Sequence, residues 1–532
     1  MRAVYKLMVL LVLVPVLANG AEKYKYFLHA GVDPDTQAFT GRYETSEENC
    51  KKVVCYRFAY NEQNQLVKVE ALLDGNYLFY DKTPAIRVEN GSQYQKLVLL
   101  KRNGDASLES QEESDVFIGL EKISKVEEQK DFDVSAIKQV LFEFDSKGRV
   151  SSISYLDHWG KLQNDRHNVA KLVFTRDEDG RVMKEKVYNK NMGRLGRYET
   201  HYRYESNGDQ LKIEKTNYNV GTDRETPVED ARGVARYSCT FDQNHNLVRV
   251  EYYNDAMNLD ENSETGVAVA VLKYDDAGNL TEEDFFGKDQ KPKDHKVLKA
   301  SVVKFKYDAA GQLVEEDFCD DKGKLKKGSG GVSILKRVFN EKERGFEFSS
   351  LDAKSKLAKN SNLIGKIAKI SLSFDENANL SESRFYKSNG QMFKFKYAPV
   401  NKYKYDDQNN LVEVAFYDRN NHIARIRKTD ASYFRFGYNN QGGLAEVSFY
   451  DKNDKPINRK DMKIAGMQMQ RDLQGYIIDL KYFDKNRKEK SYRSDIYKPA
   501  AEIEFMNDGR GLLIKGIYRD KFGEESLGQL LF

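Results

Sequence analysis

The stretch KFKYDAAGQLVEEDFC, residues 304–319, alternates apolar and charged side chains on either side of a short turn sequence. Phe305 and Tyr307 fall on one face of the first run and the two lysines fall on the other, which is the period of two that a β-strand requires. Between the runs, Asp308 suits the start of a type I turn, and Gly311 suits the positive φ that follows it. The pattern therefore predicts a β-hairpin.

The second strand of the hairpin sets the expected pairing. Leu313 is expected across from Tyr307 and on the same face as Glu315, because residues two apart share a face of a strand. In a later copy, the residues on the other face of this strand include Val414 and Phe416, which are apolar. Both faces would then be partly apolar, which predicts strands packed between neighbours.

The hairpin sequence recurs along most of the chain. Copies follow one another about every 33 residues, each anchored on its first aromatic residue, a place that Arg471 takes once. No copy can bury its own aromatic side chains, so each must depend on its neighbours. The sequence therefore predicts an all-β fold: tandem antiparallel hairpins over residues 141–532, about twelve units, in an extended or curled β-sheet or solenoid. The anchors are residues 144, 174, 204, 241, 274, 307, 339, 374, 405, 438, 471 and 505.

Residues 21–140 do not follow the regular repeat. They hold one earlier relative of it around Tyr60 and a charged stretch before residue 133. A repeat array needs its end covered. We therefore expect this part of the chain to be an N-terminal capping region.

The repeat core, aromatic-Asp-x-x-Gly-x-Leu, resembles the YD repeat of Rhs-type bacterial proteins over roughly residues 141–532. The resemblance implies a strand-rich shell or spiral, which in that family sometimes encloses a toxin domain. The spacing here is longer than the usual YD spacing. The chain ends in repeat-like sequence, GQLLF, so no toxin module is expected.

The first residues, MRAVYKLMVLLVLVPVLANGAEKYKY, are typical of a secretory signal peptide. Arg2 and Lys6 form a basic start, and the apolar run 7–17 is short for a membrane span. We expect residues 1–20 to be removed and the protein to be exported, either to the periplasm or out of the cell. No later segment is apolar enough to predict a membrane-spanning helix.

Composition narrows the possible partners. Charged residues make up 32% of the 532 residues and aromatic residues 12%, which fits charged, half-exposed strands better than a disordered chain. Lysine and arginine number 86 against 83 acidic residues, so the net charge of +3 gives no electrostatic basis for binding nucleic acid.

The chain contains four cysteines, which can form disulfides in an exported protein. Cys50 and Cys55 are close enough in sequence to form a disulfide, which we predict. Cys239 and Cys319 fall in different repeats and are expected to be free, buried thiols. A zinc site would need further ligands, and no histidine lies near either cysteine pair.

Few residues suggest chemistry. Alternating oxygen side chains at 242–246 and 375–379 resemble calcium loops, but they coincide with the repeat turn, where Asp and Asn are favoured in any case. A glutamate that recurs after the leucine, at positions 282, 315, 382, 413 and 446, is interpreted as a structural ladder bonded to Tyr or Lys. We expect no catalytic residue, no metal site and no cofactor.

The sequence therefore predicts an exported, non-catalytic β-repeat protein that serves as a binding or envelope-associated scaffold for a protein or glycan partner. One alternative is an Rhs-like shell that escorts a separate cargo or toxin. The other is a propeller-type enzyme acting on glycans, although 33 residues is short for a four-stranded blade.

Overall fold

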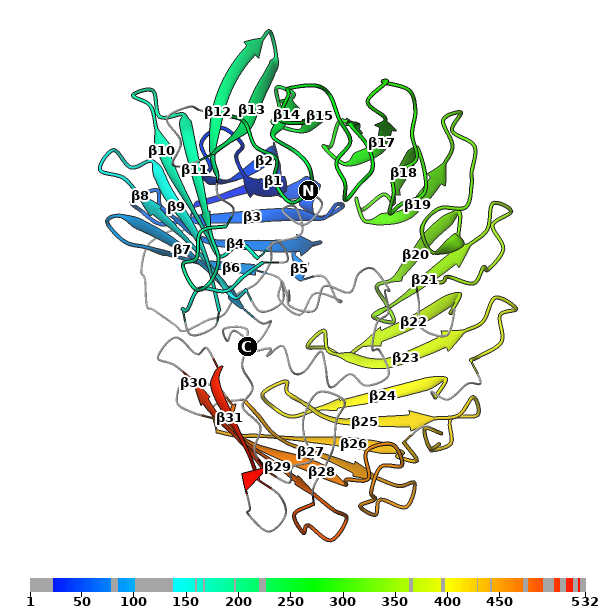
Figure 1. Cartoon of the computed structure of the whole chain (residues 1–532). Helices are drawn as coiled ribbons and strands as arrows, with labels where there is room; N and C mark the ends of the chain where they lie inside the picture. Colours follow the sequence, from blue (N-terminus) through cyan, green and yellow to red (C-terminus); the bar gives the residue numbers. More distant parts are fainter. Residues whose placement is uncertain are drawn as a thin grey trace. The chain divides into compact units, whose positions relative to one another are not determined.

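The computed structural model describes residues 23–77, 85–100, 137–157, 160–165, 168–195, 198–219, 226–362, 367–393, 398–427, 429–440, 443–471 and 477–490, and the strand segments 502–507, 513–519 and 525–526. These residues form β-strands and turns, with one short helix, α1 (Glu47–Cys50), and one 3₁₀ turn, η2 (Ser329–Gly331) (Figure 1). The predicted signal peptide and the charged stretch before residue 133 lie outside the described residues.

The described chain falls into two compact units. The first contains residues up to 338 together with 348–362, and the second contains 339–347 and residues from 363 onward. The strands up to residue 351 are β1 (Lys23–Val32), β2 (Phe39–Thr45), β3 (Cys55–Tyr60), β4 (Leu66–Leu73), β5 (Asn76–Tyr77), β6 (Ala85–Asn90), β7 (Tyr94–Leu100), β8 (Gln139–Phe144), β9 (Val150–Leu156), β10 (Lys171–Arg176), β11 (Val182–Tyr188), β12 (Tyr198–Asn207), β13 (Gln210–Asn219), β14 (Arg236–Phe241), β15 (Leu247–Tyr253), β16 (Val269–Tyr274), β17 (Leu280–Phe286), β18 (Val302–Tyr307), β19 (Leu313–Cys319), β20 (Ile334–Asn340) and β21 (Gly345–Leu351).

The strands that follow are β22 (Lys369–Phe374), β23 (Leu380–Tyr386), β24 (Val400–Tyr405), β25 (Leu411–Tyr417), β26 (Tyr433–Tyr438), β27 (Leu444–Tyr450), β28 (Gly466–Arg471), β29 (Ile477–Phe483), β30 (Glu502–Asn507), β31 (Leu513–Arg519) and β32 (Glu525–Ser526). In this second unit, β22 to β32 pair antiparallel in chain order.

In the first unit the sheet also follows the chain. Every pairing is antiparallel: β2 forms one edge, β1 and β3 follow it, and the sheet continues through β4 and β6 to β20 in sequence order. The strands β1 to β7, from the region expected to be a cap, are thus part of the same sheet. The predicted all-β array of antiparallel hairpins is confirmed, and it agrees with the strand-rich architecture that the YD resemblance implies.

A β-bulge corrects one detail of the predicted hairpin. Lys306 pairs with Glu315 but Tyr307 pairs with Leu313, so Val314 is the extra residue. The bulge turns Leu313 to the face of Tyr307, where both pack against the apolar cluster, while Glu315 stays on the opposite face. The pairing of Leu313 with Tyr307 is confirmed, but the expectation that Leu313 shares a face with Glu315 is wrong.

The first turn of the unit has the predicted chemistry. Oδ1 of Asp308 accepts hydrogen bonds from the backbone N–H groups of Ala310 at 3.0 Å and Gln312 at 2.9 Å. Gly311 has a φ of 75° and donates its N–H to the carbonyl of Asp308. The side chain of Asp308 thus holds the turn closed, and glycine supplies the left-handed residue.

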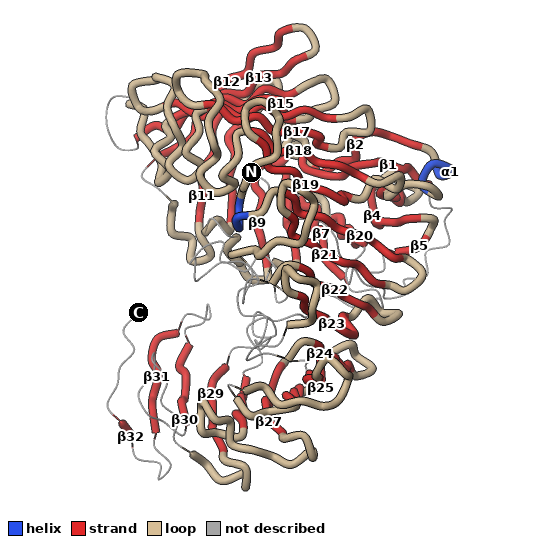
Figure 2. The backbone as a smooth tube through the Cα atoms, turned by 90° about the vertical axis from the view of Figure 1, so that its right-hand side faces the viewer, coloured by secondary structure: helices blue, strands red, loops and turns tan. Residues whose placement is uncertain are grey.

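The connector after each hairpin forms a second layer. Val267, Ala300 and Val332, from three successive connectors, are almost fully buried against the apolar face of β14 to β19. Connectors also bond to one another through the backbone. The donor–acceptor pairs, N–H to C=O, are Ser263–Arg232, Lys296–Thr265, Ser329–Leu298 and Ser361–Gly330. Figure 2 shows these connecting loops beside the strands of the first unit.

Aromatic rings from neighbouring hairpins also pack against one another. In the second unit, the ring of Phe434 lies 5.1 Å from that of Phe416 and 5.2 Å from that of Phe449, edge to face in both cases. Such pairs contribute beyond the burial of their surface. Because Phe416 and Phe434 belong to successive hairpins, each repeat depends on its neighbour for its core.

Candidate functional site: the glutamate ladder and the N-terminal seam

The recurring glutamates form a ladder of ion pairs. Glu413 lies 2.8 Å from Lys404 of its own hairpin and 2.8 Å from Arg435 of the next. Glu282 and Glu315 are bonded in the same way, each to a lysine of its own hairpin and one of the following hairpin. Glu382 contacts Arg384 and Lys402, and Glu446 contacts Arg487 and Gln468. The interpretation of these residues as a structural ladder is confirmed.

The electrostatics of the ladder keep three of its carboxylates ionised. For Glu282, Glu315 and Glu413, burial acts to raise the pKa, but hydrogen bonds and attraction from the paired lysine and arginine side chains outweigh it and the pKa falls below the ordinary value. A general acid needs the opposite shift. These glutamates are therefore placed to tie hairpins together.

A second ladder runs from the anchor residues. The hydroxyl of Tyr307 donates to the carbonyl of Leu280 at 2.9 Å, and Tyr438 donates to Leu411 at 2.9 Å. Tyr274 and Tyr405 make the same bond to the preceding unit. At Arg471, which replaces the aromatic anchor, Nε donates to the carbonyl of Leu444 at 3.1 Å. The substitution therefore preserves the hydrogen bond.

The two segments that resemble calcium loops form the ordinary repeat turn. Oδ1 of Asp242 accepts from the backbone N–H groups of Asn244 and Asn246, and Asp375 accepts from Asn377 and Asn379. The amide of Asn379 donates to the second carboxylate oxygen of Asp375 at 3.0 Å. These are the bonds that Asp308 makes, so the turn accounts for the residue pattern. Within the described ranges, no group of three or more His, Cys, Asp or Glu side chains is arranged to hold a metal ion.

The cysteines fall into two kinds. Cys50 and Cys55 form a disulfide, with Cα atoms 5.6 Å apart, between α1 and the start of β3. Cys239 and Cys319 are free and buried in different hairpins. Burial raises the pKa of both thiols, which makes them poor nucleophiles.

The first strands of the chain contact the turns of much later repeats, an arrangement we call the N-terminal seam. The carboxylate of Asp33 meets the imidazole of His245, and Arg42 donates to the backbone carbonyl of His245 at 2.9 Å. Nε2 of His29 lies 2.8 Å from the carbonyl oxygen of Ala277. The backbone N–H of Val54 donates to the carbonyl of Ala310, and Arg176 reaches the carbonyl of Thr36. The first hairpin and the segment before β3 therefore contact the turns of three consecutive repeats of this unit.

Shape complementarity adds to these bonds. A side chain at Gly278 would meet the ring of Tyr43 at 2.3 Å, so only glycine leaves room for that ring. The hydroxyl of Tyr43 is hydrogen-bonded to the amide of Asn246 in the preceding turn. Tyr43 thus occupies the space between two repeat turns.

Two ionisable groups of the seam, His29 and Asp33, both have lowered pKa values. Burial, helped by Arg42, lowers the pKa of His29, so its imidazole is neutral at neutral pH. Burial acts to raise the pKa of Asp33, but hydrogen bonds from Thr36 and His245 outweigh it and lower the pKa. The carboxylate of Asp33 is therefore charged where it meets His245.

The sequence did not identify the seam, because it joins residues at least 140 positions apart. One signal was present. His245 occupies the place that Gly148, Gly278 and Gly311 hold in other copies, with a φ of 59°. The larger side chain at this turn position contacts Asp33.

No protein-family model and no curated protein sequence matches the chain. Among solved structures, the crystal structure of TcdB2-TccC3-TEV shows 10% identity and a TM-score of 0.27, covering 88% of this chain and 26% of that chain, so this protein spans about a quarter of its length. A porin-like protein from Bacteroides vulgatus shows 12% identity and a TM-score of 0.14, covering 59% of this chain and 97% of that one. Similarity at these scores does not define a shared fold.

The fold itself defines the class: an all-β protein of tandem antiparallel hairpins, tied together by glutamate, tyrosine and connector ladders. Among the described residues, no helix has the length and apolar character needed to cross a membrane.

Proposed function

We propose that this protein is an exported, non-catalytic β-repeat scaffold that binds a protein or glycan partner at the cell envelope. The observation that carries the proposal is that the recurring glutamates form ion pairs between hairpins. Glu282, Glu315 and Glu413 are each paired with lysine or arginine of the same and the next hairpin, and their pKa values are lowered rather than raised. They act as structural links within a repeated surface.

Repetition supports binding over catalysis for a physical reason. A catalytic site needs one or two groups in environments unlike the rest of the protein, whereas here the same pairing recurs from hairpin to hairpin. An array of equivalent hairpins presents an extended surface, which suits a large partner. No feature of the described residues favours the shell-with-cargo alternative or the glycan-active enzyme.

Two measurements test the proposal. Cell fractionation of the full chain should recover it outside the cytoplasm, shortened by the predicted residues 1–20. A photo-crosslinking amino acid in place of Met183 or Val338, which are exposed on strands, should give a discrete adduct with an envelope component. An unprocessed cytoplasmic chain would overturn export, and an absence of discrete adducts from both positions would overturn the binding role.

A further inference from the structure

Three successive connectors of the first unit carry a dense group of exposed lysines, which we call the lysine rim. These connectors are residues 287–301, 320–333 and 352–362, and each contains more lysines than acidic residues. The preceding connector, 254–268, contains four acidic residues and no basic one. The exposed lysines are Lys288, Lys291, Lys296, Lys299, Lys322, Lys324, Lys327, Lys354, Lys356 and Lys359.

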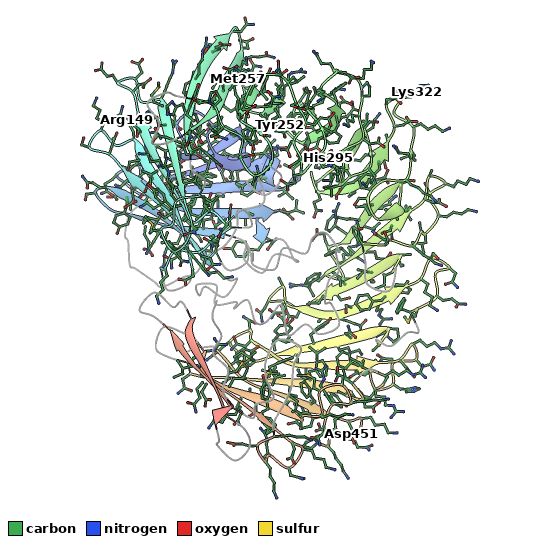
Figure 3. The ribbon with its side chains drawn as sticks, viewed as in Figure 1. Arg149, Tyr252, Met257, His295, Lys322 and Asp451 are labelled. Atoms are coloured by element: carbon green, nitrogen blue, oxygen red, sulfur yellow. A yellow bond between two sulfur atoms is a disulfide. The ribbon has the colours of Figure 1, made fainter. Side chains whose placement is uncertain are left out.

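The repeat places these lysines on one edge of the sheet. Each connector follows the second strand of a hairpin, so connectors share an edge and the first turns share the other. Backbone hydrogen bonds from Lys296 to Thr265, from Ser329 to Leu298 and from Ser361 to Gly330 hold the connectors side by side. With two strands per unit, successive connectors are spaced roughly 10 Å apart. Figure 3 shows Lys322 at the periphery of its loop, away from the strands.

Ion pairing within the rim is uneven. Lysines next to the acidic connector are neutralised: Lys288 lies 3.2 Å from Asp260, and Lys293 lies 2.5 Å from Glu261. Further along, no ion pair within the described residues involves Lys322, Lys324, Lys327, Lys354, Lys356 or Lys359. Asp320 and Asp352 accept hydrogen bonds from backbone N–H groups of their own turns. Lysines outnumber acidic residues by four to two in connector 320–333 and by three to one in connector 352–362, so both connectors carry excess positive charge.

We propose that the lysine rim binds a linear acidic polysaccharide, a ligand class that rests on the envelope-scaffold function proposed above. The excess positive charge recurs once per repeat along one edge of the sheet. This arrangement fits a linear polymer better than a flat membrane surface. A glycan with one acid per disaccharide repeats its charge at a comparable interval. Electrostatic complementarity of this kind brings the two chains together and sets their register.

The chemistry of the rim argues against other polyanions. The three connectors contain lysine but no arginine, so the bidentate contacts typical of phosphate recognition are missing there. They also contain no Phe, Tyr or Trp on which exposed bases could stack. An extended acidic peptide repeats its charges at about 3.3 Å per residue, which is out of step with the connectors.

The test uses the full chain and fluorescent hyaluronan oligosaccharides, which carry one carboxylate per disaccharide. We expect saturable binding that weakens as salt is added, and no binding to uncharged dextran. The triple variant K322Q/K324Q/K327Q should weaken binding about tenfold, since each exposed cation near a polyanion contributes modestly. The matched control K23Q/K52Q/K147Q removes the same charge from exposed lysines away from the rim and should change the affinity less than about twofold.

Three outcomes would overturn the inference: no binding to the oligosaccharides, equal losses in both triple variants, or preference for anionic lipid vesicles or polyglutamate over the glycan. Circular dichroism of both variants checks that they fold. If the crosslinking experiment recovers an envelope partner while the glycan does not bind, only this inference fails and the scaffold function stands.

Discussion

Nδ1 of His245 lies 2.5 Å from Oδ2 of Asp33, although 212 positions separate the two residues in sequence. The contact joins the loop after β1 to the turn between β14 and β15. It places a charged carboxylate against an imidazole in the one repeat turn where histidine replaces glycine. The N-terminal hairpin is thereby fixed to a particular repeat.

Replacing His245 with glycine should release this contact without unfolding the repeat. Glycine accepts the positive φ, and the contact is partly exposed on the His245 side, so the free energy of unfolding should change by less than about 1 kcal/mol. Hydrogen exchange of residues 33–45 should nevertheless become faster. The matched control is Ala378→Gly, at the same turn position of another copy, which should leave exchange in residues 33–45 unchanged. Unaltered exchange in the His245 variant would show that the seam does not depend on this pair.

Acid should weaken the first unit through His29. An unfolded histidine has a pKa near 6.5, and burial lowers the pKa of His29 in the folded protein. Below about pH 6.5 the unfolded state therefore binds a proton that the folded state does not, and the free energy of unfolding falls until the pH reaches the lowered folded pKa. Urea unfolding at a series of pH values should show this loss, and His29→Gln should reduce it. Identical pH profiles for the two proteins would contradict the assignment.

Gly278 and Gly311 form a matched pair that separates steric contact from backbone strain. Both have positive φ, but a Cβ at Gly278 would meet the ring of Tyr43, whereas a Cβ at Gly311 meets nothing within 4 Å. Gly311→Ala should cost about 1 kcal/mol for the left-handed backbone alone. Gly278→Ala should cost about 1–3 kcal/mol more, as overpacking does. Adding Tyr43→Ala should remove most of that excess in a double-mutant cycle, and additive effects would argue against the contact.

Tyr307→Phe tests the anchor ladder. Loss of the hydroxyl leaves the carbonyl of Leu280 without its side-chain donor, and the free energy of unfolding should fall by about 0.5–1.5 kcal/mol. Tyr94→Phe is the control, since Tyr94 is 44% exposed and its hydroxyl can bond to water. Equal effects at the two positions would assign no special role to the anchor bond.

The sequence predicted what is local. Alternation, the turn chemistry of Asp308 and Gly311, the repeat and the pairing of the ladder glutamates all depend on residues within one unit or its neighbour. The bulge at Val314 was missed because side-chain alternation does not reveal an extra residue, and it changed the face assigned to Leu313. The seam was missed for a different reason: Asp33, His29 and Tyr43 meet their partners only after several intervening hairpins have curled the sheet.

The seam also bears on how many repeats this protein can contain. His29, Tyr43 and Val54 each contact a particular repeat turn. Adding or removing one hairpin between β2 and the turn at Ala310 would move those turns away from their partners, so the number of repeats in that interval is constrained. Beyond that turn, the glutamate, tyrosine and connector bonds of the described residues join neighbouring repeats. Whole repeats could be duplicated or lost there without disturbing the N-terminal hairpin, and members of such a lineage would be expected to vary in length on that side.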